Sequence, residues 1–322
     1  MYSNVKRDDE YIFRLHDFIR REYGIASMNI APAKRGYYGE TWRLDAAEGS
    51  YFVKLDYSAA HKPLYEQSFY VIEHLCNHGI DFISRIIKTT DGRLSSNFDG
   101  AVLGVFYWIE GENIQDERTK IQEYQILAKV YAVPADGIEL PAEDFSNRSA
   151  DIFFSQWDKL KHEHAGNDAA RITKLFDENS EKLVHRAERL KLFAERCRPD
   201  KSHFYITHGD AGGNVIVSGG DFYIVDWDAP VLAPPERDAW FCIYWDWAIT
   251  AFNNSLRQNG IDYALRPERM AYYCYHAFFT YLTEYMDTYF DIGNRNGDFA
   301  ENLRDYFECW IEEEIRYADK IK

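Results

Sequence analysis

The spacing of apolar residues changes along the first third of the chain and predicts two kinds of element there. Over residues 9–23 apolar side chains return every three or four positions, which predicts an amphipathic helix that ends at Gly24. Residues 33–55 instead alternate apolar and polar positions around the turn DAAEGS, as in a β-hairpin. The helical spacing returns over residues 61–78. This part of the chain therefore predicts a sheet accompanied by two helices.

Three more short apolar runs follow and predict strands at residues 80–87, 94–98 and 101–109. With the hairpin they predict a five-stranded antiparallel sheet. Helical spacing then dominates, at residues 121–133, 150–164, 168–197, 267–290 and 298–321. The pattern predicts the α+β class. Gly111 marks the expected boundary between an N-terminal domain over 1–110 and a mainly helical domain over 111–322.

One stretch inside the helical part, Phe204 to Asp228, returns to strand-forming residues. Its apolar runs are separated by the turns HGDAGGN and SGGD, whose glycines suit tight loops and hairpins. The first turn carries Asp210 and Asn214, and the last run ends at Asp226 and Asp228. We therefore expect two strand ends with polar side chains to lie next to each other.

Composition and charge narrow the classes of function. The 322-residue chain is 46% hydrophobic and 16% aromatic, which is typical of a globular protein of about two domains. Its formal net charge of −16 argues against a nucleic-acid partner, because binding to a phosphate backbone needs a cationic surface. The same charge suits a small cationic substrate. Five scattered cysteines, a charged start and the lack of a long apolar run predict a cytoplasmic protein with no membrane partner. We expect a monomer or a homodimer.

The side chains at the two strand ends are those that phosphoryl transfer requires. One carboxylate can orient an attacking hydroxyl and accept its proton, while an amide and a second carboxylate can hold Mg²⁺ through oxygen atoms. The motif HGD at 208–210 followed by Asn214, and the motif DWD at 226–228, resemble the catalytic loop and metal-binding motif of the aminoglycoside phosphotransferase and choline kinase family. The run IVDWDAPVLAPPERDAWF is similar to the spectinomycin phosphotransferase branch of that family.

This resemblance implies a bilobal, protein-kinase-like fold with a small N-lobe and a mainly helical C-lobe, and an enzyme that uses ATP and Mg²⁺. It assigns Asp210 as the catalytic residue, Asn214 and Asp226 as metal ligands, and Asp228 as a nearby group that contacts metal or substrate. In the family four residues usually separate the Asp from the Asn, whereas here only the three residues 211–213 do. A tightened glycine loop could still direct Asn214 to the metal, or the loss could leave the metal site imperfect. The first interpretation is favoured because both ligand types are kept.

The resemblance also assigns phosphate-binding residues in the N-lobe. Lys54, in the strand FVKL, is expected to neutralise the α- and β-phosphates, although a strand lysine without that context is more typical of a solvated edge. Glu66 in the following helix is its expected partner, with Glu73 as the alternative. Gly36 and Gly39 fall where a phosphate-covering loop would lie, although two such glycines more often mark an ordinary β-turn.

Further binding roles follow from the same resemblance. The backbone groups of Tyr107 and Ile109 are expected to pair with the adenine edge, an ordinary strand end being the alternative. Glu236 and Trp240 could line a pocket for a cationic sugar or cyclitol, although most aromatic residues nearby are expected in the core. His208 is expected to fix the catalytic loop through hydrogen bonds to the backbone and not to act as a general base.

Three functions remain open from the sequence. The first is an ATP- and Mg²⁺-dependent kinase of a hydroxyl group on a small cationic molecule, namely an aminoglycoside or aminocyclitol, which would confer antibiotic resistance. The second keeps the chemistry but acts on a metabolic amino alcohol or sugar derivative. The third is a catalytically silent nucleotide-binding relative, which only the shortened loop supports. A shared fold does not decide among them.

Overall fold

The computed structural model describes residues 7–33, 39–58, 62–163, 167–292 and 299–322. The chain packs into two compact units, one formed by Met1–Pro141 with Tyr205–Leu232 and the other by Ala142–Phe204 with Ala233–Lys322. The break between these units does not coincide with the predicted boundary after residue 110. The physical reason is that Glu112 pairs with Val217 through two backbone hydrogen bonds, which joins the chain beyond residue 110 and the hairpin to the first unit.

The first unit is built on an antiparallel sheet. Its strands run in the order β1 (Ser27–Pro32), β2 (Glu40–Ala46), β3 (Gly49–Asp56), β6 (Ala101–Tyr107) and β4 (Ile86–Ile87), and β5 (Ser96–Phe98) also pairs with β6. The predicted class is confirmed, but within the described residues the sheet has six strands and not five. Strand β1 was not predicted from the sequence. It lies at the edge of the sheet and none of its side chains is buried, so its sequence shows no alternation of apolar and polar residues.

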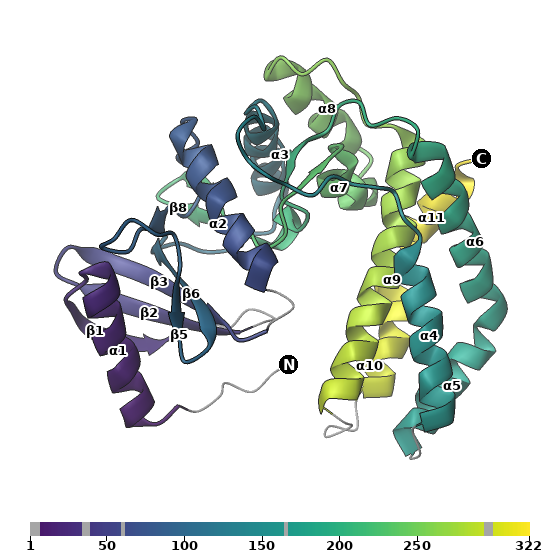
Figure 1. The fold of residues 1–322 in the computed structure, drawn as a ribbon. Helices are drawn as coiled ribbons and strands as arrows, with labels where there is room; N and C mark the ends of the chain where they lie inside the picture. Colours follow the sequence, from purple (N-terminus) through teal and green to yellow (C-terminus); the bar gives the residue numbers. More distant parts are fainter. Residues whose placement is uncertain (1–6, 34–38, 59–61, 164–166, 293–298) are drawn as a thin grey trace. The chain divides into compact units, whose positions relative to one another are not determined.

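Two helices pack on opposite faces of this sheet, α1 (Asp9–Tyr23) and α2 (Lys62–Asn77), and Figure 1 shows both beside it. Successive side chains of a strand point to opposite faces. Val53 of β3 therefore enters the core that contains α1, while its neighbour Lys54 points to the α2 side and lies 5.2 Å from the centre of the Tyr65 ring. Alternation along β3 thus directs Lys54 away from the core beneath α1.

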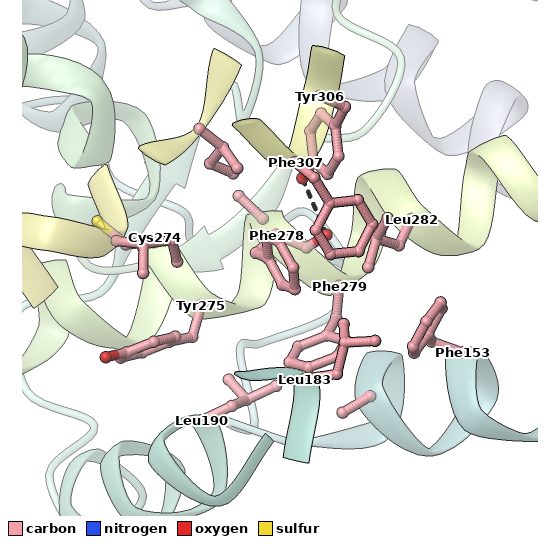
Figure 2. Close-up of a cluster of buried hydrophobic side chains, with 14 of the residues drawn as sticks. Phe153, Leu183, Leu190, Cys274, Tyr275, Phe278, Phe279, Leu282, Tyr306 and Phe307 are labelled. Carbon is pink, nitrogen blue, oxygen red and sulfur yellow. Dashed lines mark hydrogen bonds between the residues drawn. The ribbon is translucent and has the colours of Figure 1, made fainter. Parts of the chain in front are cut away.

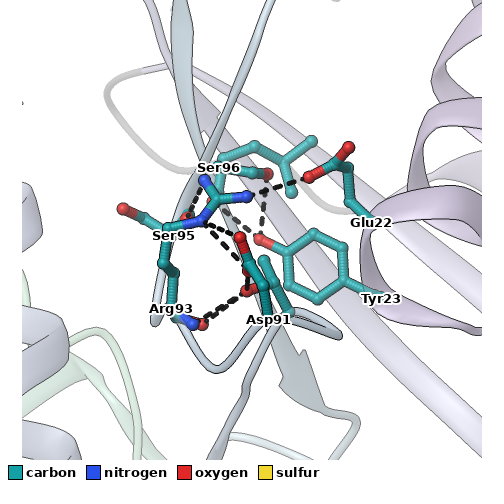
Figure 3. Close-up of polar contacts among 8 residues, drawn as sticks. Glu22, Tyr23, Asp91, Arg93, Ser95 and Ser96 are labelled. Carbon is teal, nitrogen blue, oxygen red and sulfur yellow. Dashed lines mark hydrogen bonds and ion pairs between the residues drawn. The ribbon is translucent and has the colours of Figure 1, made fainter.

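Hydrogen bonds and ion pairs among polar side chains connect the C-terminal end of α1 to the sheet (Figure 3). The Arg93 guanidinium donates hydrogen bonds to Asp91 and, at 3.0 Å, to Glu22 of α1. The hydroxyl of Tyr23 donates to the carbonyl of Leu103 in β6, at 3.0 Å. These contacts hold the helix in register with the strands, so that α1 forms one fixed layer of the unit.

The hairpin predicted between residues 204 and 228 is confirmed as β8 (Val215–Ser218) and β9 (Asp221–Ile224). It follows β7 (Tyr205–Thr207), which pairs with β10 (Val231–Ala233). Helix α3 (Glu117–Tyr131) packs against β7, β8 and β9. The backbone N–H of Ile224 donates to the carbonyl of Phe82 at 2.9 Å. The hairpin is therefore anchored to the N-terminal part of the chain, in the unit that holds Lys54.

The second unit is helical. Its elements are α4 (Arg148–Glu163), α5 (Asn167–Glu178), α6 (Ser180–Cys197), α7 (Glu236–Ala239), η2 (Trp240–Tyr244), α8 (Ala248–Gln258), α9 (Pro267–Ile292), α10 (Phe299–Asp305), the π-helical η3 (Tyr306–Trp310) and α11 (Glu312–Lys320). Helix α9 packs against α4, α6 and α11. Figure 2 shows Phe278, Phe279 and Leu282 of α9 among the aromatic and aliphatic side chains of its neighbours. This apolar core gives the unit its own stability, because burial of apolar surface is the main favourable term in folding.

Two helices predicted as continuous are interrupted. The predicted helix 168–197 breaks at Asn179, whose side chain donates a hydrogen bond to the carbonyl of Leu175 at 2.9 Å and thereby competes with the regular ladder. The predicted helix 298–321 contains the π-helical turn Tyr306–Trp310. Across the described ranges, no helix has both the length and the apolar character needed to cross a bilayer.

Candidate active site

The loop after β7 brings Asp210 and Asn214 together. Residues Ala211–Gly213 form a single 3-10 turn, closed by a hydrogen bond from the Asn214 backbone N–H to the Ala211 carbonyl at 2.9 Å. The Asn214 side-chain amide donates to the Asp210 carbonyl at 2.6 Å and to the Asp210 carboxylate at 3.2 Å. The shortened loop thus still places the predicted metal-ligating amide beside the predicted catalytic carboxylate.

The end of β9 lies next to this loop. The Val225 backbone N–H donates to the Asn214 carbonyl at 2.9 Å, so the two strand ends are hydrogen-bonded to each other as expected. Asp226 follows with a φ of 65°, a left-handed conformation that is uncommon for residues other than glycine. The Asp228 backbone N–H then donates to the Asp226 carbonyl at 3.0 Å. This sharp turn places the two carboxylates, two residues apart, on one side of the chain where both contact the same lysine.

That lysine is Lys54. Its ammonium lies 2.5 Å from Asp226 Oδ1 and 2.5 Å from Asp228 Oδ2. The Lys54 side chain is only 9% exposed, whereas the two carboxylates are 39% and 40% exposed. Lys54 is therefore not a solvated lysine of an edge strand. The buried ammonium holds two partly accessible carboxylates, and this group carries a net charge of −1 when all three are ionised.

The environment shifts the pKa of each member of this group. Burial lowers the pKa of Lys54, but the two carboxylates outweigh burial, and the net pKa is raised. Burial raises the pKa of Asp226, but the charge and hydrogen bond of Lys54 outweigh it and lower the net pKa. For Asp228, burial and the neighbouring Asp226 carboxylate outweigh Lys54, so its pKa is raised. Asp226 is thus the more readily ionised carboxylate, as a metal ligand requires.

The predicted ion pair between Lys54 and Glu66 is not formed. Among the residues that the structure describes, Lys54 pairs with Asp226 and Asp228. The α2 side chain over its ammonium is Tyr65, and Glu66 is half-buried one position further along the helix. The alternative partner, Glu73, is paired with Lys88 at 2.6 Å. A contact between Glu66 and a nucleotide stays a prediction.

His208 has the structural role that was expected. Its ring is buried, and its Nδ1 accepts a hydrogen bond from the Asp210 backbone N–H at 3.1 Å. The other ring nitrogen, Nε2, lies 2.9 Å from the Val225 carbonyl and therefore carries the proton. The ring also packs edge-on against Trp227, with the centroids 4.6 Å apart. His208 links the loop that begins at Asp210 to the end of β9, and both of its nitrogens are used in doing so.

The residues in and near the N-terminal sheet that were predicted to contact the nucleotide have different outcomes. Gly36 lies outside the described residues. Gly39 has a φ of 72°, and a Cβ there would lie 2.0 Å from the Leu55 carbonyl oxygen, so close packing on β3 is enough to require glycine. The Tyr107 N–H donates to the Arg85 carbonyl at 3.0 Å, so it is not free to pair with a purine. The role of Ile109 stays a prediction.

Two residues of the second unit, Glu236 and Trp240, were predicted to bind substrate, and the burial of Glu236 argues against its role. Glu236 is completely buried, where its carboxylate accepts hydrogen bonds from the Tyr263 hydroxyl at 2.7 Å and from the Arg266 backbone N–H at 2.6 Å. Burial raises its pKa. Glu236 thus joins two segments of the helical unit and has no exposed surface to offer a ligand. Trp240 is half-buried against the helical core, and a contact with substrate stays a prediction.

The oxygen donors of the first unit fit a magnesium ion. No group of three or more His, Cys, Asp or Glu side chains is gathered as a metal site in the part of the chain that the structure describes. The available donors are the Asn214 amide oxygen and the Asp226 and Asp228 carboxylates, which are hard ligands. Mg²⁺ is commonly held by one or two carboxylates with water and substrate phosphates completing its shell. This donor set therefore suits a Mg²⁺ ion that arrives with a nucleotide.

Three residues beside the loop were missed in the sequence. Asn113 and Lys120 lie 100 and 92 positions before the loop carbonyls that they contact, and Glu123 is paired with Lys120. The sequence around these residues shows only a strand end and a helix. Asn113 donates to two carbonyls of the 213–215 segment, and Lys120 donates to the Gly212 carbonyl. No local sequence pattern predicts these contacts, because they depend on how α3 packs against the hairpin.

Known phosphotransferases share the fold of this chain over almost its full length. The model of the phosphotransferase enzyme family matches residues 29–273. A solved spectinomycin phosphotransferase, in complex with ADP and spectinomycin, shares the fold at 20% identity with a TM-score of 0.76, covering 96% of this chain and 97% of its own. An aminoglycoside phosphotransferase described as putative, from Ralstonia eutropha, has 15% identity and a TM-score of 0.62, with 98% and 100% covered. The choline kinase LicA from Streptococcus pneumoniae has 14% identity and a TM-score of 0.60, with 97% and 99% covered. No curated protein matches the chain significantly in sequence.

Proposed function

Because this chain belongs to the phosphotransferase enzyme family, we propose that it transfers the γ-phosphoryl group of ATP, with Mg²⁺, to a hydroxyl group of a small cationic molecule. The observation that carries the proposal is the convergence of Lys54, Asp226 and Asp228 in the unit that also holds Asp210 and Asn214. A cation, two carboxylates, an amide and a separate carboxylate are the parts that phosphoryl transfer uses.

Each side chain has a distinct role in this proposal. Asp210, exposed at the start of its loop, accepts a hydrogen bond from the substrate hydroxyl and takes its proton as the phosphoryl group is transferred. Lys54 exchanges its carboxylate partners for phosphate oxygens when the nucleotide binds. Asn214 and Asp226 would hold Mg²⁺, which when bound neutralises charge on the phosphates. Positioning and electrostatic stabilisation supply most of the rate enhancement.

An aminoglycoside or aminocyclitol is the acceptor we favour. The formal net charge of −16 favours the approach of a cation, since a protein's field concentrates ligands of opposite charge. Spectinomycin is bound in one of the solved relatives that this chain resembles over almost its full length. A metabolic amino alcohol is the second candidate, supported by the likeness to a choline kinase.

The test is phosphoryl transfer by the purified protein with MgATP and a panel that contains spectinomycin, other aminoglycosides and choline. We expect product with at least one acceptor, and the preferred one identifies the class. Asp210→Asn should lower kcat by about 10²- to 10⁴-fold with little change in the KM for ATP. The matched control is Asp221→Asn, an exposed aspartate in the hairpin turn, which should retain normal kinetics.

Two outcomes would contradict the proposal. Near-normal turnover by Asp210→Asn would remove the assigned catalytic residue. Absence of transfer to every acceptor, together with basal ATP hydrolysis that is the same in the parent and in Asp226→Ala, would favour the catalytically silent alternative.

A further inference from the structure

The three-residue loop between Asp210 and Asn214 is rich in glycine. Two of its three residues are glycines, which lose the most conformational freedom when they are ordered, and Asn214 closes the loop through its backbone N–H to Ala211 and its side-chain amide to Asp210. The carbonyls of Gly212 and Gly213 also both accept hydrogen bonds from side chains outside the loop. The outside donors therefore add to the contacts through which Asn214 closes the loop.

The first donor is Lys120 of α3. Its ammonium lies 2.7 Å from the Gly212 carbonyl and 3.0 Å from Glu123 Oε2. Lys120 is 6% exposed and Glu123 is 1% exposed. A buried ion pair loses the hydration of both charges and is often no more stabilising than apolar residues of similar volume. Stability alone therefore does not account for a lysine here, whereas delivery of a charged donor to a loop carbonyl does.

The second donor is Asn113, which follows the end of β6. Its amide donates to the Gly213 carbonyl at 2.5 Å and to the Val215 carbonyl at 3.0 Å. The preceding residues are fixed against β8, because Glu112 pairs with Val217 and a Cβ on Gly111 would lie 2.4 Å from the Val217 carbonyl oxygen. Asn113 thus reaches the loop from backbone that is itself held on the hairpin.

We propose that Lys120, held by Glu123, and Asn113 are positioning residues that keep the shortened loop in the conformation in which Asn214 can bind the metal of a metal–nucleotide complex. This inference rests on the proposed function. Asp210 has separate support, since its backbone N–H is bound by His208. Loss of Lys120 therefore affects the Asn214 end of the loop more than the Asp210 end, and metal activation suffers more than turnover at saturating metal.

The experiment compares Lys120→Met with Lys120→Arg, which keeps a charged donor. Lys129→Met, an exposed lysine of the same helix, is the matched control. We expect Lys120→Met to weaken binding of Mn²⁺ to the complex with AMP-PNP, followed by electron paramagnetic resonance, by about 10- to 100-fold, the usual effect of losing a group that orients a metal ligand. Lys120→Arg should recover most of the affinity, and Lys129→Met should match the parent protein.

Amide hydrogen exchange over residues 209–216 gives a readout that does not depend on activity. We expect faster exchange in Lys120→Met and in Asn113→Ala, whose exposed position lets the variant fold. Unchanged exchange in both variants would overturn the positioning role, as would parental Mn²⁺ affinity in both. If the parent protein itself binds no metal–nucleotide complex, the proposed function fails while the exchange result still decides whether these residues hold the loop.

Discussion

The ammonium of Lys54 lies 2.5 Å from the Asp226 carboxylate, although 172 positions separate the two residues along the chain. The contact joins the middle of the N-terminal sheet to the end of the hairpin within one compact unit. It places a buried cation between two carboxylates, which an apolar side chain at position 54 could not do.

Replacing Lys54 by Met should remove this cation and leave two neighbouring carboxylates unpaired. We expect kcat/KM for ATP to fall by about 10²- to 10³-fold, as for the loss of one preorganised charged contact to a transferring group. Steady-state kinetics measure the effect. Lys88→Met, which removes an exposed lysine paired with Glu73, is the control and should lose less than about twofold. Equal losses in the two variants would show that Lys54 does not contact the nucleotide.

Replacing Gly39 by Ala should destabilise the protein because the new Cβ would overlap the Leu55 carbonyl oxygen, 2.0 Å away. Gly100→Ala is a matched control, since Gly100 also has a positive φ, of 89°, but has no atom within 4 Å of the added Cβ. We expect Gly39→Ala to lower the free energy of unfolding by about 1 to 3 kcal/mol more than Gly100→Ala. Denaturant unfolding measures the difference. Equal stabilities of Gly39→Ala and Gly100→Ala would mean that the backbone near Gly39 can move away from Leu55 without loss of stability.

Replacing Glu236 by Ala should affect stability and not substrate binding. The change leaves the Tyr263 hydroxyl and the Arg266 backbone N–H without their acceptor, which costs about 1 to 3 kcal/mol for each buried group. Glu236→Gln keeps an acceptor oxygen and should retain most of the stability. Thermal unfolding together with the KM for the acceptor tests this assignment. A large rise in that KM with unchanged stability would instead support the predicted contact between Glu236 and the substrate.

The stability of the second unit should depend on pH through Glu314. This residue of α11 is 4% exposed, and burial raises the pKa of its carboxyl group from 4.5 to about 7. Because the folded-state pKa is raised, the contribution to stability is complete below pH 4.5 and is lost as the pH rises through about 7. Glu314→Gln should therefore raise the free energy of unfolding at pH 8 by up to about 3 kcal/mol and change it little at pH 5.

Denaturant unfolding at pH 5 and pH 8 measures this difference. Glu308→Gln, at an exposed position, makes the same change of charge and should show no such pH dependence. A stabilisation by Glu314→Gln that is the same at both pH values would mean that the Glu314 carboxyl keeps its ordinary pKa.

Elements whose pattern is local could be predicted from the residues alone. The helix at 9–23, the hairpin at 215–224 and the motifs that carry Asp210 and Asp226 could all be predicted, because their spacing, glycines and turn residues act on neighbours in the chain. The role of His208 was also predictable, since its hydrogen bonds to Asp210 and Val225 span 2 and 17 positions. Strand β1 was not, because an edge strand buries too little to impose alternation.

Which distant side chains meet could not be predicted, because it depends on tertiary packing. It paired Lys54 with Asp226 and Asp228 and not with Glu66, buried Glu236 beneath Tyr263 and Arg266, and brought Lys120 to the Gly212 carbonyl. Each of these contacts joins residues that are 27 to 174 positions apart. Over such separations residue type sets which contacts are favourable but not which partner is within reach.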